Sequence, residues 1–131
     1  MMYINVDGEQ VELKTTLGVS RRMEERFKLP LFQIFDKLGA AEIDELVDLT
    51  VIASGLQGPE AKELARRILD SWDYSDLMLA VEGLLANLMF SGTPDEVEAK
   101  LERFPAAETQ KNVMRGFLGL PPRVIPGEIG N

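Results

Sequence analysis

Residues Tyr3 to Phe27 read Y-I-N-V-D-G-E-Q-V-E-L-K-T-T-L-G-V-S-R-R-M-E-E-R-F, and the spacing of the apolar residues changes within this stretch. Up to Lys14, apolar and polar residues alternate on both sides of Asp7-Gly8. An Asp-Gly pair flanked by such alternation predicts a β-hairpin over residues 3–14. From Thr16 onward the apolar residues recur at steps near four, which predicts a helix. The chain is therefore expected to begin with a hairpin and to continue with helices.

The predicted hairpin needs a partner, because an isolated two-stranded sheet is only marginally stable in water. Two arrangements would bury its apolar side chains. The hairpin packs on the helices that follow it, or it extends a sheet in a neighbouring subunit. The sequence leaves both open.

Start and stop signals divide the rest of the chain into helices. Pro30 and Pro59 suit the first turn of a helix, where a missing N–H costs nothing. The segment Thr93-Pro94-Asp95-Glu96 has the form of a capping box, and Ser75 is expected to cap the most apolar helix, about residues 76–90. A third helix is expected over about residues 40–53 and a weaker one over residues 107–118. The apolar stripes of these helices are expected to face the core: Leu17, Val19, Met23, Phe27, Leu31, Ile34, Phe35, Leu38, Ile43, Leu46, Val47, Val51, Leu64, Ala65, Ile68, Leu69, Val97, Leu101 and Phe104.

Together these signals predict a mainly α fold, with an N-terminal β-hairpin followed by a small bundle of five to seven helices. The chain of 131 residues is 45% hydrophobic, which suits one domain over residues 1–118, with the bundle over residues 16–118. Beyond Gly119 the segment L-P-P-R-V-I-P-G-E-I-G-N cannot continue a helix, so residues 119–131 are expected to form a flexible tail. Its apolar residues Leu120, Val124, Ile125 and Ile129 suggest either docking on another surface or simple disorder.

The composition excludes much of enzyme chemistry. The chain has no cysteine and no histidine, which removes disulfides, thiolate nucleophiles, zinc sites of the Cys/His kind and imidazole catalysis. The acidic residues of 42–48 have no glycine-rich loop beside them and are interpreted as a solvated helix face. Asp70, Asp73 and Asp76 are interpreted as caps and turn residues. We predict no catalytic residue, no metal ligand and no cofactor.

Charge and patterning also weigh against nucleic acid and membrane partners. The formal net charge of −8 repels phosphate. The segment L-G-V-S-R-R looks like the turn and opening of a DNA-reading helix, but a helix-turn-helix needs a helix upstream, where the hairpin is expected. The most apolar run, residues 77–90, is shorter than the roughly 20 residues that cross a bilayer. No signal peptide is recognised in M-M-Y-I-N-V-D-G-E, so a cytoplasmic protein is expected.

Size, acidity and three segments resemble the tail assembly chaperones of long-tailed bacteriophages and related prophages. The segments are the hairpin Y-I-N-V-D-G-E-Q-V-E-L-K, the following T-T-L-G-V-S-R-R-M-E-E-R-F, and L-M-F-S-G-T-P-D-E-V-E at residues 88–98. The resemblance implies a non-enzymatic protein of the host cytoplasm. It implies binding to the hydrophobic, helical tape-measure protein, which stays soluble while tail-tube subunits assemble around it. It also implies self-association into a homo-oligomer and, in many members, a longer product made by ribosomal frameshifting.

A client with exposed apolar helices requires an apolar groove. We expect this groove between the first, second and fifth helices, because methionine side chains adapt to partner surfaces and because Phe32 lies off the apolar stripe of its helix. The alternative is that the methionines simply fill the core. The residues predicted to bind the partner are Leu17, Met23, Phe27, Phe32, Met78 and Met89.

Other functions remain open at this stage. A phage structural or connector protein would share the composition and layout, and so would an acidic helical adaptor between proteins. A DNA-binding regulator is less favoured because the upstream helix is missing. An enzyme is the least favoured class.

Overall fold

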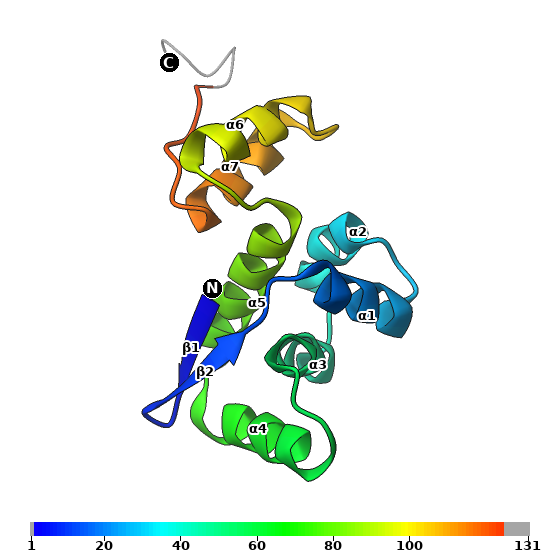
Figure 1. Ribbon diagram of the computed structural model, residues 1–131. Helices are drawn as coiled ribbons and strands as arrows, with labels where there is room; N and C mark the ends of the chain where they lie inside the picture. Colours follow the sequence, from blue (N-terminus) through cyan, green and yellow to red (C-terminus); the bar gives the residue numbers. More distant parts are fainter. Residues whose placement is uncertain (1, 125–131) are drawn as a thin grey trace.

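The computed structural model describes residues 2–124 of the chain (Figure 1). Within this range it contains an antiparallel hairpin, seven α-helices and one short 3₁₀ turn. The predicted fold class and order of elements are confirmed. The elements are β1 Met2–Val6, β2 Glu9–Leu13, α1 Leu17–Phe27, α2 Leu31–Asp36, the 3₁₀ turn Leu38–Ala40, α3 Ile43–Ser54, α4 Gly58–Ser71, α5 Tyr74–Met89, α6 Pro94–Arg103 and α7 Glu108–Phe117.

The hairpin closes through the predicted Asp7-Gly8 turn, in which both residues have positive φ angles, 54° and 79°. This backbone is typical of the two-residue turn whose twist matches that of paired strands. Val6 pairs with Glu9, and Ile4 pairs with Val11. β1 packs against α4 and β2 against α3, so the hairpin rests on its own helices, the first of the two expected arrangements.

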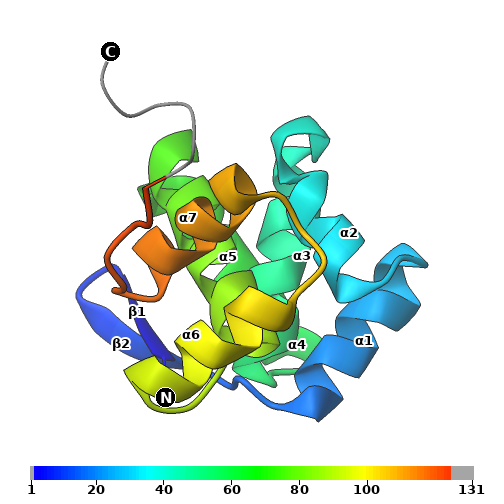
Figure 2. The same ribbon diagram turned by 90° about the horizontal axis from the view of Figure 1, so that it is seen from above.

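Helix α5 runs through the centre of the molecule, with α2, α3 and α7 packed around it (Figures 1 and 2). Its residues Val81, Leu84 and Leu85 are completely buried. This central position agrees with its apolar composition on nearly every face. Helix α3 is the second hub and contacts α1, α4, α5 and β2.

The pair α6 and α7 covers one end of α5 and is joined to α2 by aromatic and polar contacts. The ring of Phe104 lies edge to face with Phe32 at 5.0 Å and with Phe90 at 5.2 Å between centroids. Gln110 Nε2 donates to Asp36 Oδ1 at 2.7 Å. Residues far apart in the sequence therefore tie the last two helices to the second.

Two helix starts differ from the prediction. The cap of α5 is Asp73 and not Ser75, because the Asp73 carboxylate accepts a hydrogen bond from the Asp76 N–H at 2.8 Å. Helix α3 begins at Ile43 and not near residue 40, since residues 38–40 form the 3₁₀ turn and the Glu45 carboxylate accepts from the Glu42 N–H at 2.9 Å. The predicted cap at Thr93 is confirmed, and its hydroxyl accepts from the Glu96 N–H at 3.3 Å.

The segment after α7 is extended, as expected, but residues 119–124 lie against the helices. The Leu120 N–H donates to the Arg115 carbonyl at 2.8 Å, and the Leu120 side chain packs on the core. Val124 is exposed. Residues 119–124 thus contact the helices, while Ile125 and Ile129 lie outside the described residues.

Within residues 2–124 no single helix is long and apolar enough to cross a membrane. By length and composition alone a span would need α5 and α6 together, and these two helices meet at a bend of 85°.

Candidate protein-binding surface

An apolar hollow of about 140 Å³ lies where the ends of three helices meet. Ile43 is the first residue of α3, Leu69 lies in the last turn of α4, and Tyr74 is the first residue of α5. Each of these side chains is about half exposed, at 50%, 51% and 50% respectively. Large apolar side chains gathered on a surface indicate a site for another molecule. We call this site the α3–α4–α5 hollow.

The buried side chains Ile68 and Leu77 complete the lining of the α3–α4–α5 hollow, and Trp72 lies between α4 and α5. The Trp72 indole is held in place, because its Nε1–H donates to the Asn5 carbonyl at 3.1 Å. The hollow has one charged lining residue, Asp73, whose carboxylate is engaged as the cap of α5. The hollow therefore offers rigid apolar surface with little competing polar chemistry.

The sequence interpretation missed this hollow because it placed Ile43 and Leu69 in the core. Both sit on the apolar stripes of their helices, but they lie at helix ends, where no neighbouring element covers them. The available signal was the pair Trp72 and Tyr74 in an acidic turn, since aromatic residues are uncommon in turns that only cap helices.

A second apolar hollow, of about 190 Å³, lies between α1, α2 and α3. Phe27 lines it, together with Leu29, Ile34 and Leu38. The guanidinium of Arg26 covers the Phe27 ring at 5.0 Å from its centroid and pairs with Asp48 at 2.9 Å. Two charged residues, Lys37 and Glu45, also line this hollow.

The six residues predicted to bind a partner do not form one groove. Phe27 lines the second hollow, whereas Phe32 is half-buried against Phe104. Met23 is completely buried and Leu17 is 86% exposed at the start of α1, so the prediction is wrong for Met23 as a surface residue and for Leu17 as a core residue. Met78 and Met89 are half-buried and, eleven residues apart on α5, share one face of that helix.

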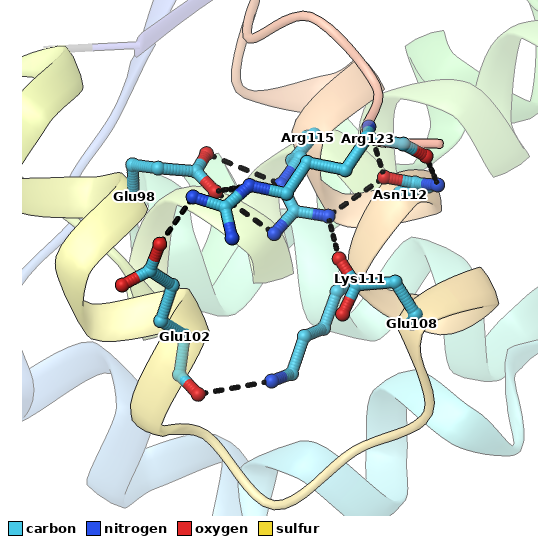
Figure 3. Close-up of polar contacts among 7 residues, drawn as sticks. All are labelled: Glu98, Glu102, Glu108, Lys111, Asn112, Arg115 and Arg123. Atoms are coloured by element: carbon cyan, nitrogen blue, oxygen red, sulfur yellow. Dashed lines mark hydrogen bonds and ion pairs between the residues drawn. The ribbon is translucent and has the colours of Figure 1, made fainter. Parts of the chain in front are cut away.

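A buried polar cluster joins α6, α7 and the segment after them (Figure 3). Arg115 is completely buried; its guanidinium donates to Glu98, to Glu108 at 2.7 Å and to Asn112 at 2.7 Å. Burial by itself lowers the pKa of Arg115, but the hydrogen bonds that its guanidinium donates to Glu98 and Glu108 outweigh this effect, and the pKa is raised. Because these groups satisfy one another, the cluster holds the helices together.

The same cluster fixes the segment after α7. Asn112 Oδ1 accepts from the Arg123 N–H at 2.9 Å, and Asn112 Nδ2 donates to the Arg123 carbonyl at 2.8 Å. The Arg123 side chain pairs with Glu98 at 3.0 Å and with Glu102. This cluster could not be recognised from the sequence, since an arginine on a helix surface is normally solvated.

Two structural observations bear on other functions. The residues before α1 form strand β2 and not a helix, so the layout of a helix-turn-helix is absent there. Among residues 2–124, no three His, Cys, Asp or Glu side chains are grouped so that they could hold a metal ion.

Comparison of the chain with protein-family models, with curated proteins and with solved structures finds no match in any of the three.

Proposed function

We propose that this protein is a non-enzymatic assembly chaperone of the kind its sequence resembles. It would bind the apolar helices of a tape-measure protein and keep that client soluble during tail assembly in the host cytoplasm. The observation that carries the proposal is the α3–α4–α5 hollow, where Ile43, Leu69 and Tyr74 are each half exposed around an apolar floor.

The energetics of the hollow suit reversible binding. Completing the burial of a half-exposed apolar side chain contributes on the order of 1 kcal/mol, so three such side chains add a few kcal/mol to association. A contribution of this size is small enough for the client to be released when tail-tube subunits take its place. The net charge of −8 keeps such complexes apart from one another through repulsion.

The proposal is tested by placing a charge in the hollow. In Leu69→Asp, a carboxylate would have to be desolvated when the client helix binds, which costs several kcal/mol. We expect this variant to lose capture of co-expressed tape-measure protein. The matched control is Val113→Asp, which puts the same charge at an exposed apolar position on α7. Equal capture by both variants, with both still folded by circular dichroism, would rule out the hollow as the client site.

A further inference from the structure

Along the outer edge of β2, two residues have backbone groups with no hydrogen-bond partner among residues 2–124. In a hairpin closed by a two-residue turn, the residues flanking the turn exchange hydrogen bonds, and every second pair beyond them does so too. Val6–Glu9 and Ile4–Val11 are such pairs. The N–H and C=O groups of Gln10 and Glu12 therefore point away from β1, toward the outside of the sheet.

Hydrogen bonds made by neighbouring residues of the hairpin confirm which backbone groups point outward. The Lys14 N–H, next in the outward series on β2, donates to the Ala53 carbonyl of α3 at 2.8 Å. On the other edge, the outward carbonyl of Asn5 accepts from Trp72 at 3.1 Å. A side chain and a helix end thus bond to the outward groups of Asn5 and Lys14, while among the described residues none bonds to those of Gln10 and Glu12.

A groove of about 590 Å³ runs beside this open edge. Residues 9–12 of β2 form one wall, and α4 together with the connection from α3 forms the other. Figure 1 shows β2 lying above α4. Leu56, Pro59 and Leu64 give the groove an apolar part. A strand added to β2 would find hydrogen bonds on one side and apolar contacts on the other.

The charge of the groove selects the kind of strand. Four glutamates line it against one arginine, Arg67. Arg67 pairs with Glu9 at 3.2 Å and Arg66 pairs with Glu63 at 2.5 Å, whereas Glu12 and Glu60 have no cationic partner among the described residues. A second copy of β2 would bring its own Glu9 and Glu12 against these carboxylates, and like charges on adjacent strands are destabilising.

We propose that the groove between β2 and α4 binds an extended, basic segment of a partner protein, which adds to β2 as a third strand. Its backbone pairs with Gln10 and Glu12, its Lys or Arg side chains approach Glu12 and Glu60, and its apolar side chains contact Leu56 and Leu64. This site is separate from the α3–α4–α5 hollow, and its test uses no tape-measure protein. The two proposals therefore succeed or fail independently.

The first test uses a blocked peptide of alternating Lys and Val, with an alternating Glu and Val peptide as control. Added to the full-length protein, the Lys peptide should shift the amide resonances of Gln10 and Glu12 and slow their hydrogen exchange. It should bind at least about tenfold more tightly than the Glu peptide, a preference that added salt reduces. No binding at millimolar peptide, equal binding of the two peptides, or shifts confined to other residues would overturn the proposal.

Strand addition is distinguished from simple charge attraction by N-methylation. Only alternate residues of an added strand bond to β2. Methylating the amides of the Lys residues in one peptide and those of the Val residues in another should abolish binding in one case and preserve it in the other. Equal binding of the two methylated peptides would show that no strand forms.

Charge selection is tested by the double variant Glu12→Lys, Glu60→Lys, which should prefer the Glu peptide. The control variant, Glu25→Lys with Asp44→Lys, makes the same change in net charge at exposed positions away from the groove. It should keep the original preference. A folded groove variant that still prefers the Lys peptide would contradict the assignment of Glu12 and Glu60.

Discussion

The guanidinium of Arg115 is completely buried, and its Nη2 atom lies 2.9 Å from Oε1 of Glu98 on the neighbouring helix. This pair connects α7 to α6 through a charge that water does not reach. We expect Arg115→Met to lower the free energy of unfolding by about 3 kcal/mol, because it leaves the partly buried carboxylates of Glu98 and Glu108 with fewer partners. Urea denaturation of the purified variant measures this loss.

The control for Arg115 is Arg22→Met, which removes an exposed arginine from α1. Its effect should stay within about 0.5 kcal/mol, as is usual at exposed positions. Similar losses in the two variants would show that the buried cluster adds nothing beyond the general cost of removing an arginine.

Burial raises the pKa of Glu82 on α5 above the ordinary glutamate value of 4.5. A raised folded-state pKa means that the folded chain holds the proton more tightly than the unfolded chain does. The protonated Glu82 side chain therefore makes its full contribution to the free energy of unfolding below the unfolded-state pKa. This contribution is lost as the pH rises through the folded-state pKa. Glu82→Gln should thus be more stable than the parent chain at pH 7, and the difference should fade as the pH drops below 4.5.

Thermal unfolding of Glu82→Gln and the parent chain across this pH range measures the effect. Glu25→Gln, an exposed position on α1, is the control. A stability difference independent of pH would mean that the substitution acts through packing and not through titration.

Asn112 holds the segment after α7 through the backbone of Arg123. Asn112→Ala removes both hydrogen bonds, each worth about 1 kcal/mol, so the amide of Arg123 should exchange with solvent on the order of tenfold faster. The adjacent Val113→Ala, at an exposed position, serves as the control. The exchange rate of the Arg123 amide is measured by NMR. An unchanged rate in Asn112→Ala would show that other contacts hold the segment.

The Arg123 side chain lowers the pKa of Glu102 by a hydrogen bond and by its charge. In Arg123→Ala this pKa should return toward 4.5, as read from the side-chain carbon shifts of Glu102 in a pH titration. Arg103→Ala, which removes a nearby exposed arginine of α6, should leave it in place. If the two variants gave the same pKa, Arg123 would not contact Glu102 in solution.

The apolar spacing was enough to predict the hairpin, the order of helices and most of the core. Local signals such as Asp7-Gly8 and Thr93 act within a few residues, so they could be recognised in the sequence. Whether a helix end is covered depends on tertiary packing, and Ile43 and Leu69 therefore looked like core residues. The prediction of Met23 in a groove failed for the same reason, because the inward and outward faces of α1 depend on where α2 and α3 lie.

The buried cluster around Arg115 lay beyond sequence reasoning for a different cause. Its partners Glu98 and Glu108 belong to two helices, and only their packing turns three ordinary charged residues into one satisfied group. The open edge of β2 is an intermediate case. Its acidic residues are visible in E-Q-V-E-L, but the groove beside it requires α4.

The central claim, that this protein keeps an apolar helical client in solution, is tested most directly by co-expression with a tape-measure protein, followed by sizing of the captured complex by light scattering. A client that aggregates alone should remain in solution with the parent chain, in a complex of defined mass, and should aggregate again with Leu69→Asp. If the client stays aggregated with the parent chain present, the protein is not a chaperone for it.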